Sequence, residues 1–310
     1  MKLYKYVRPD VVRKMFEDDK VLVKCSIPSE FNDPYELFLT VDFNVGPRLM
    51  AFYQDLVGTI VQTPTACFSR APDVVPMWAH YGSEGQGAVI EFDEECLADA
   101  YPECRFGDVE YRDAADPLLT DRLRFAAGTL KFRHAHQIQT AVLWAAYFTK
   151  ASAWSYERER RMVVPESAHL EARDKQQFLM VRKHCVTGVF SGPRTPPDLR
   201  DHLGEAAANL GCRFYKTVIG RLTARPYFDT ADGTYTFDGD ALREATYTCC
   251  DCGEPLSTAG DHCSWCGVGE EERAEAAADN PLRLLDRYGL LDAYRTGLPA
   301  PSGPADNHSE

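Results

Sequence analysis

The chain has 310 residues, of which 45% are apolar and 26% are charged, and its net charge is −13. This length corresponds to about two domains, and the composition is that of a globular protein, which excludes a wholly disordered or fibrous chain. No apolar run is long enough for a membrane helix, and lysines interrupt the first six residues before a signal-peptide core could form. We therefore expect a soluble, cytoplasmic protein with no membrane partner.

The negative charge is concentrated near the C-terminus. Residues 228–280 contain thirteen acidic residues and two arginines, and so hold −11 of the net −13. Neither this segment nor the nearly neutral remainder has the basic surface that non-specific binding to nucleic acid requires. Nucleic acid is therefore not an expected partner.

The first 227 residues predict an α+β domain with a mixed sheet and helices. Residues 49–61 have the apolar spacing of a helix with one buried face, whereas residues 65–69 and 87–93 are short apolar runs bounded by turn residues, as strands are. Residues 116–153 are rich in alanine and leucine, which predicts helix with a break near Gly128. Further strands are expected at 161–164, 178–190 and 212–226, with a helix at 197–210 that Gly211 ends. No glycine-rich phosphate loop follows the first strand, which argues against a Rossmann or P-loop fold.

The composition changes after residue 227. Residues 228–239 are expected to form a hairpin, and residues 228–270 to form a small acidic zinc ribbon. Residues 271–298 predict C-terminal helices: an acidic helix at 270–279 is followed by an amphipathic one at 281–296 that could dock on either domain. Residues 299–310 are rich in proline, glycine and serine and predict a disordered tail.

The cysteines indicate a metal site. Five of the eleven lie between residues 249 and 266, and the others are scattered, which predicts buried thiols and a metal cluster rather than a disulfide framework. Two C-x-x-C-G knuckles direct four thiolates at one ion, and the glycine after each pair permits a left-handed backbone. The expected ligands of a structural zinc ion are Cys249, Cys252, Cys263 and Cys266. Iron in a rubredoxin-like site and a thiol redox pair are the alternatives.

The neighbouring Cys250 lies in the wrong register to be a fifth ligand. Four thiolates around one zinc ion add two negative charges to an already acidic module, so we expect a protein partner for the ribbon. The simpler alternative is that the ribbon only stabilises the fold of a short segment that has too little core without metal.

Two glutamates are the main candidates for chemistry. Glu157 and Glu159 precede the apolar run at 162–164, and in an extended chain alternate side chains share a face, so both carboxylates are expected in one cleft while Arg158 and Arg160 point away. Carboxylates about 7 Å apart raise each other's pKa, which suits one as a proton acceptor and the other as a stabiliser of positive charge. The alternative is a solvated edge strand with cross-strand ion pairs.

Other polar and aromatic residues near predicted strand ends have simpler explanations as well. Asn32 and Asp33 precede a proline and could only initiate a turn. Trp78 and Tyr81 lie three residues apart on a predicted helix and could belong to the core. His80 points elsewhere on that helix, and a lone histidine is more often structural than a ligand.

Five motifs in chain order resemble an uncharacterised prokaryotic family, a domain of unknown function. They are L-Y-K-Y at 3–6, F-N-D-P-[FY]-E at 31–36, C-F-S at 67–69, M-W-x-H-Y at 77–81, and W-x-Y-E-x-E-x-R beginning at Trp154. The resemblance covers residues 1–226 and leaves the zinc ribbon outside as an appended module. It implies no established activity.

A second resemblance is to ADP-ribosyltransferases. Those enzymes combine an early polar residue on the first strand, a serine-bearing strand followed by an aromatic-bearing helix, and an E-x-E motif that runs into an apolar strand. Tyr6, Ser69 and the pair Glu157 and Glu159 take these places here. The resemblance implies an ADP-ribosyltransferase-like α+β fold and an enzyme that cleaves the nicotinamide–ribose bond of NAD and transfers the product to an acceptor.

By this resemblance Glu159 is the catalytic glutamate at the nicotinamide ribose, Glu157 orients the acceptor, and Ser69 completes the catalytic set. The residues expected to contact NAD are Tyr6, Asn32, Asp33, Trp78, His80 and Tyr81. Two other classes of function stay open. One is a non-catalytic ligand-sensing or protein-binding module whose ribbon recruits a partner, and the other is a hydrolase with a divalent metal held by Asp33, Glu157 and Glu159.

Overall fold

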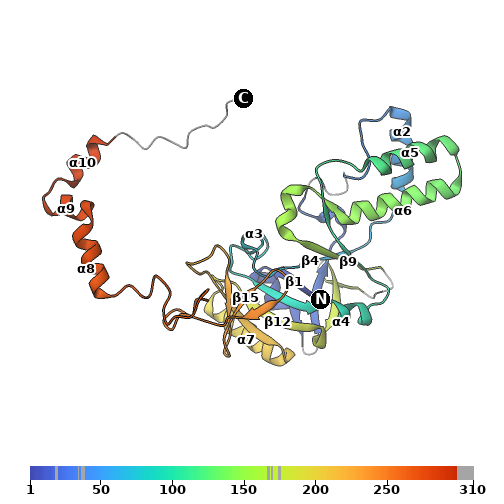
Figure 1. Cartoon of the computed structure of the whole chain (residues 1–310). Coiled ribbons are helices and arrows are strands. Elements are labelled where there is room, and N and C mark those ends of the chain that lie inside the picture. The colour runs from blue at the N-terminus through green and yellow to red at the C-terminus, as the bar shows by residue number, and fades with distance from the viewer. Residues whose placement is uncertain are drawn as a thin grey trace.

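The computed structural model describes residues 1–17, 20–33, 35, 39–165, 168, 170–173 and 176–298. A body of β-sheets carries a helical arm on one side and a C-terminal segment that extends away on the other (Figure 1). The tail expected at 299–310 lies outside the described residues, as do Pro34 and Glu36 of the F-N-D-P-Y-E motif. None of the helices among the described residues is both long and apolar enough to cross a bilayer.

The main sheet has ten strands among the described residues. In spatial order they are β16 (Leu242–Glu244), β15 (Thr234–Phe237), β14 (Tyr227–Asp229), β13 (Arg213–Val218), β12 (Val186–Ser191), β5 (Ala88–Asp93), β1 (Lys2–Val7), β4 (Thr65–Ser69), β9 (Glu159–Val163) and β6 (Arg105–Asp108). β12 and β13 are parallel and the other neighbours are antiparallel. The expected α+β fold with a mixed sheet is therefore confirmed.

The hairpin expected at 228–239 is present as β14 and β15, but it belongs to the main sheet. β14 pairs with β13, and β16 continues the sheet to Glu244. Phe228 is fully buried in an aromatic cluster with Phe190 and Tyr215. Burial of this side chain explains why the hairpin packs with the sheet. The hairpin also contacts the first cysteine knuckle, because the Tyr227 hydroxyl donates to the Cys252 carbonyl oxygen over 3.1 Å.

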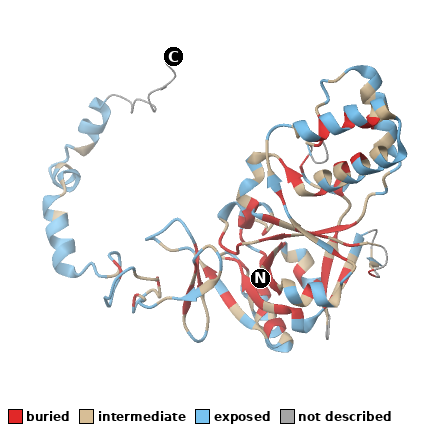
Figure 2. Cartoon of the chain, turned by 45° about the vertical axis from the view of Figure 1, so that its right-hand side comes forward, coloured by how far each residue is buried: buried red, intermediate tan, exposed pale blue. Residues whose placement is uncertain are grey.

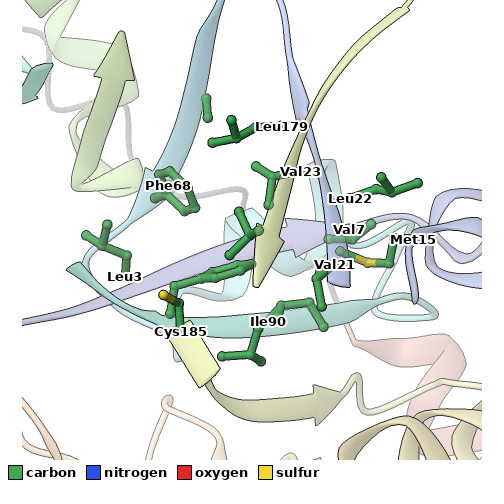
Figure 3. Packing of buried hydrophobic residues seen from close by; sticks show 14 of the residues in the cluster. Leu3, Val7, Met15, Val21, Leu22, Val23, Phe68, Ile90, Leu179 and Cys185 are labelled. Carbon is green, nitrogen blue, oxygen red and sulfur yellow. The ribbon is translucent and has the colours of Figure 1, made fainter. Parts of the chain in front are cut away.

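A second, antiparallel sheet packs across the first. Its order is β10 (Glu171–Arg173), β11 (Gln176–Arg182), β3 (Lys20–Cys25) and β2 (Phe16–Glu17). The largest hydrophobic cluster includes side chains from both sheets, and Figure 3 shows Val21 and Leu179 of the second sheet near Ile90 and Phe68 of the first. Helices α1 (Pro9–Met15), α4 (Glu94–Ala100) and α7 (Pro197–Leu210) also contribute to this cluster.

The single strand expected at 178–190 is two strands in two different sheets. β11 ends at Arg182, a 3-10 turn covers Lys183–Cys185, and β12 then begins in the main sheet. Both strands contribute apolar side chains to the same core, and the exposed Arg182, Lys183 and His184 between them mark the turn that divides them.

The expectation that the scattered cysteines are all free thiols is wrong for one pair. Cys96 on α4 and Cys185 form a disulfide across 89 residues of sequence. Their side chains meet because α4 packs against the turn that carries Cys185. Cys25, Cys67, Cys104 and Cys212 are free.

The helical arm consists of α2 (Pro47–Gly58), α5 (Pro117–Thr129) and α6 (Phe132–Phe148), which share a hydrophobic cluster of their own. The break expected near Gly128 lies at Leu130, which has a left-handed backbone with a φ of 52°. At the base of the arm, β7 (Glu110–Tyr111) pairs in parallel with β8 (Thr149–Lys150). This pairing fixes the backbone of Lys150 beside the body.

The C-terminal segment consists of the cysteine knuckles and three short helices. These are α8 (Glu270–Asp279), α9 (Pro281–Arg287) and α10 (Leu291–Gly297), and none of them has a buried side chain (Figure 2). The helix expected at 281–296 is divided at Gly289, whose φ is +68°. Instead of docking on a domain, these helices extend away from the body (Figure 1).

Candidate functional site

The candidate site is a cavity at the point where β4 changes its pairing partner. At one end of β4, Ser69 lies opposite Tyr4 of β1, and at the other end Thr65 forms a bridge with Ser26, just after β3. The two partners diverge between these points, so no strand among the described residues pairs with that edge of β4 there. A cavity of about 520 Å³ occupies the fork. This size is typical of a site for a small molecule.

The cavity is lined by segments that are distant in sequence. Strands β1, β3, β4 and β9 contribute, together with residues 30–32, the end of α3 (Val75–His80) and the base of the arm. A larger, more open hollow of about 890 Å³ lies over β12 and β13, but none of the residues predicted for the site lines it.

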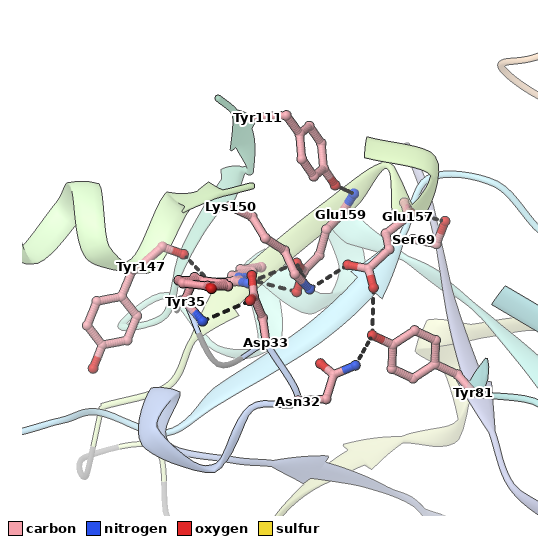
Figure 4. A network of polar contacts seen from close by, with 11 residues as sticks. Asn32, Asp33, Tyr35, Ser69, Tyr81, Tyr111, Tyr147, Lys150, Glu157 and Glu159 are labelled. Atoms are coloured by element: carbon pink, nitrogen blue, oxygen red, sulfur yellow. Dashed lines mark hydrogen bonds and ion pairs between the residues drawn. The ribbon is translucent and has the colours of Figure 1, made fainter. Parts of the chain in front are cut away.

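A chain of polar contacts crosses one wall of the cavity (Figure 4). Asn32 Nδ2 donates to the Tyr81 hydroxyl over 2.8 Å, and this hydroxyl donates to Glu157 Oε1 over 2.6 Å. Lys150 Nζ lies 2.6 Å from Glu157 Oε2 and 3.5 Å from Glu159 Oε2. The lysine therefore connects the two carboxylates.

Glu159 is held by an arginine on its own strand. Arg161 Nε and Nη2 donate to the two carboxylate oxygens of Glu159, each over 2.9 Å. Residues 159 and 161 share a face of β9 because side chains alternate along a strand. Both side chains are almost fully buried, so the pair is a buried, bidentate interaction.

The position of Glu157 depends on an unusual backbone rather than on the expected extended chain. A 3-10 helix at Ser152–Glu157 (η2) precedes Arg158, whose φ of 47° is left-handed, and β9 begins only at Glu159. The Ser69 hydroxyl donates to the Glu157 carbonyl oxygen over 2.7 Å. Ser69 thus fixes the backbone between the two glutamates, and both carboxylates still line the same cavity.

The electrostatics of the two glutamates differ. Burial raises the pKa of Glu157 above its ordinary value, because it outweighs the nearby Lys150 ammonium. Burial acts in the same direction on Glu159, but Arg161 and Lys150 outweigh it and lower the pKa to about 2. We expected each glutamate to raise the pKa of the other. This holds for Glu157 and is wrong for Glu159, because Arg161 lies beside Glu159 in addition to Lys150.

The aromatic residues predicted for the site are divided between the cavity and the core. Tyr81 lines the cavity, and burial beside Glu157 raises its pKa. Tyr6 also lines it, with its hydroxyl donating to the Ala71 carbonyl oxygen over 3.0 Å. Trp78 is buried and packs edge-on against Tyr6, and it does not line the cavity.

The other predicted residues lie at the mouth. His80 lines the cavity, as does Asn32, whereas Asp33 does not. Asp33 Oδ1 accepts a hydrogen bond from the Tyr35 backbone N–H over 2.9 Å, which is the turn contact that its position before a proline also predicts. Sequence reasoning assigned no role to Lys150 or Arg161, although Lys150 precedes the W-x-Y-E-x-E-x-R motif by four residues and Arg161 ends it. The position of Arg161 two residues after Glu159 on a strand could have indicated its role.

The carboxylates do not form a cage for a divalent cation. Among the described residues, the groups of three or more possible ligands that lie close enough to hold one ion consist of cysteines with or without one histidine. The Lys150 ammonium lies between Glu157 and Glu159, where such a cation would have to be. This geometry disfavours the metal-dependent hydrolase.

The four predicted cysteine ligands do come together. The Sγ atoms of Cys249, Cys252, Cys263 and Cys266 lie within 4.8 Å of one another. Cys252 Sγ and Cys263 Sγ are 3.8 Å apart, which is the edge of a tetrahedron with zinc–sulfur distances of about 2.3 Å. The cluster could therefore hold a metal ion such as zinc. Cys250 is exposed and lies outside the cluster.

The knuckles differ in their glycines. Gly253 has the expected left-handed φ of +72°. Gly267 is not among the residues with positive φ, although its N–H donates to the Cys263 carbonyl oxygen over 2.9 Å as a knuckle requires. Glu254 joins the module to the body, because its buried Oε1 accepts from the backbone N–H groups of Arg221 and Leu222.

Comparison with known proteins identifies one family. Residues 77–162 match the profile of a family described as "Protein of unknown function (DUF2971)", which confirms the expected resemblance to an uncharacterised family over this segment. The match runs from α3 to β9 and includes Tyr81, Lys150, Glu157 and Glu159. No curated protein and no solved structure matches the chain.

Proposed function

We propose that the cavity is the active site of an enzyme that cleaves the nicotinamide–ribose bond of NAD and transfers ADP-ribose to an acceptor. The observation that supports this proposal is the convergence of Tyr6, Ser69, Glu157 and Glu159 on one cavity. These residues come from three strands and a 3-10 helix that are far apart in sequence. They are the same residues that the resemblance to ADP-ribosyltransferases assigns to the site.

The two glutamates suit the two halves of the reaction. When the bond breaks, nicotinamide leaves with the electron pair and positive charge develops on the ribose, which a fixed carboxylate stabilises. Glu159 has a pKa of about 2 and so stays ionised at neutral pH. Because its partners Arg161 and Lys150 hold it rigidly, no reorganisation is needed as the charge develops.

Glu157 is the proton acceptor for the incoming nucleophile. Its raised pKa places it closer to neutral pH than an ordinary glutamate, which favours general-base catalysis. As the nucleophile bonds to the ribose carbon, its proton passes to Glu157, and the positive charge of the ribose is discharged. The hydrogen bond from Tyr81 orients the carboxylate for this transfer.

A binding module without catalysis is the second candidate, and one observation favours it. Both carboxylate oxygens of Glu159 already accept hydrogen bonds from Arg161, and a neutralised carboxylate stabilises a cation less than a free one does. In that case the network would only shape a ligand-binding cavity.

The experiment that separates the two is nicotinamide release from NAD by the wild-type protein and by Glu159→Gln, with Glu91→Gln as the matched control. Glu91 is also a buried glutamate, on β5, but it does not line the cavity. We expect Glu159→Gln to lower turnover at least about a hundredfold, with the control unchanged. Glu157→Gln should impair transfer to an acceptor more than hydrolysis of NAD. A wild-type protein that releases no nicotinamide would refute the transferase.

We also propose that the cysteine cluster is a structural zinc ribbon that contacts a protein partner. A segment this short has little core of its own, so metal binding would supply much of its folding free energy. The ribbon exposes 65% of Trp265 and 42% of Tyr247, aromatic residues of the kind enriched in protein interfaces. Elemental analysis of protein purified without chelators should find one zinc per chain, whereas iron or no metal would contradict the assignment.

A further inference from the structure

Two lysines line the cavity on the other side of β4 from Glu159. Lys24 lies on β3 between Leu22 and Ser26, and these three alternate residues all face the cavity. Lys5 lies on β1, and it also lines the cavity. Because β9 borders one edge of β4 while β1 and the end of β3 approach the other, the lysines and the glutamates occupy different walls.

Lys5 is fixed in this position by contacts with β4. Its Nζ donates to the Cys67 carbonyl oxygen over 3.0 Å and lies 5.4 Å from the centre of the Phe68 ring. An ammonium group has three N–H donors, so this hydrogen bond occupies one of them. Burial lowers the pKa of Lys5 and the nearby charge of Lys24 acts in the same direction, whereas Cys67, Cys25 and Glu159 act in the opposite direction.

Neither lysine has a carboxylate partner among the described residues. The other cations of the cavity all do: Lys150 pairs with Glu157, Arg161 with Glu159, and Arg8 at the mouth with Asp10. Two ammonium groups that line one cavity and repel each other, neither of them in a salt bridge among the described residues, are costly unless an anion binds between them. Such an arrangement is typical of a site that receives its negative charge from a ligand.

We infer that Lys5 and Lys24 form an anion-binding subsite for the diphosphate of a nucleotide. This inference rests on the proposed function and extends it, because a diphosphate held at the lysines would leave the attached ribose to reach the glutamates across β4. The separation of the two walls matches a ligand that is anionic at one part and develops positive charge at another.

The test is calorimetric titration of ADP-ribose, which carries the diphosphate, and of adenosine, which does not. Lys24→Met should weaken ADP-ribose binding about ten- to a hundredfold, since charge-assisted hydrogen bonds to phosphate are lost, and should leave adenosine binding unchanged. Lys20→Met is the matched control, because Lys20 lies on the same strand and does not line the cavity. Lys24→Arg, which keeps the charge, should restore most of the affinity.

Lys5→Met should have the same effect as Lys24→Met, and the Lys24 variants keep the test valid if the more enclosed Lys5 variant does not fold. Unchanged affinity of Lys24→Met for ADP-ribose would overturn the subsite, even if the wild type releases nicotinamide from NAD. Conversely, ADP-ribose binding that depends on Lys24 in a protein that never consumes NAD would support the subsite and refute the transferase. Failure of the wild type to bind ADP-ribose would overturn the subsite as well.

Discussion

Replacing Lys150 by methionine should destabilise the fold strongly, because this lysine neutralises two buried carboxylates. Lys150, Glu157 and Glu159 are each at least about nine-tenths buried, and the ammonium is 2.6 Å from one carboxylate and 3.5 Å from the other. Removing one partner of a buried ion pair leaves an uncompensated charge and costs about 3–5 kcal/mol. We expect a loss of this size in the free energy of unfolding at pH 7.5.

The loss should depend on pH in a defined direction. In the wild type the pKa of Glu159 is about 2 in the folded state. Relative to an ordinary glutamate, this stabilises the fold by roughly 3 kcal/mol above pH 5, and the stabilisation disappears as the pH falls toward 2. Glu157 has a raised pKa, so its charged form destabilises the fold as the pH rises through that value. Without Lys150 both pKa values rise, so protonation of Glu157 at pH 5.5 should recover part of the lost stability.

Urea unfolding at pH 7.5 and at pH 5.5 measures both effects. Lys216→Met is the control, because Lys216 is exposed on β13, and it should change the free energy of unfolding by less than about 0.5 kcal/mol. Adding Glu157→Gln to Lys150→Met should restore part of the stability by removing the uncompensated charge. A loss below about 1 kcal/mol at pH 7.5, or a double variant no more stable than Lys150→Met, would refute the reasoning.

Three further changes test other parts of the structure. Cys252→Ser should abolish metal binding and unfold the knuckles while the sheets stay folded. Elemental analysis measures the bound metal and limited proteolysis measures the unfolding; retention of a full metal equivalent would contradict this prediction. Glu254→Ala should leave the backbone N–H groups of Arg221 and Leu222 without this acceptor and loosen the ribbon from the body, so cleavage near residue 250 should become faster than in the wild type. Gly87→Ala should lower the melting temperature by several degrees, because the added Cβ would lie 2.1 Å from the Val7 carbonyl oxygen. An unchanged melting temperature would contradict this and would show that β1 can shift at little cost.

Elements that depend on local sequence signals could be predicted closely. The helix at 197–210 begins at a proline and ends at Gly211, whose φ of +70° lets its N–H reach the last carbonyl groups, and the structure has the same bounds. The strand at 65–69 and the acidic helix at 270–279 also match. The C-x-x-C-G spacing is informative for the same reason, since the geometry that it encodes spans only a few residues.

Features that depend on long-range packing could not be predicted. Lys150 belongs to the site because β8 pairs with β7 at the base of the arm, and nothing near it in sequence reports that pairing. The cavity exists because β4 changes partner between Tyr4, on β1 of the main sheet, and Ser26, just after β3 of the second sheet. Periodicity shows that a strand has a buried face, but it does not show which strands are its neighbours.

The place of β1 in the sheet determines when the protein can fold during synthesis. β1 is an interior strand of the sheet, between β5 and β4, and it is made about 180 residues before β12 at Val186, with which the sheet beyond β5 starts. At about 5–20 residues per second, roughly ten to forty seconds pass before that strand has been made. During this time the apolar side chains of β1, such as Leu3 and Val7, lack much of the core that later buries them. Loss of β1 would therefore remove an interior strand that two neighbours depend on, rather than an edge strand.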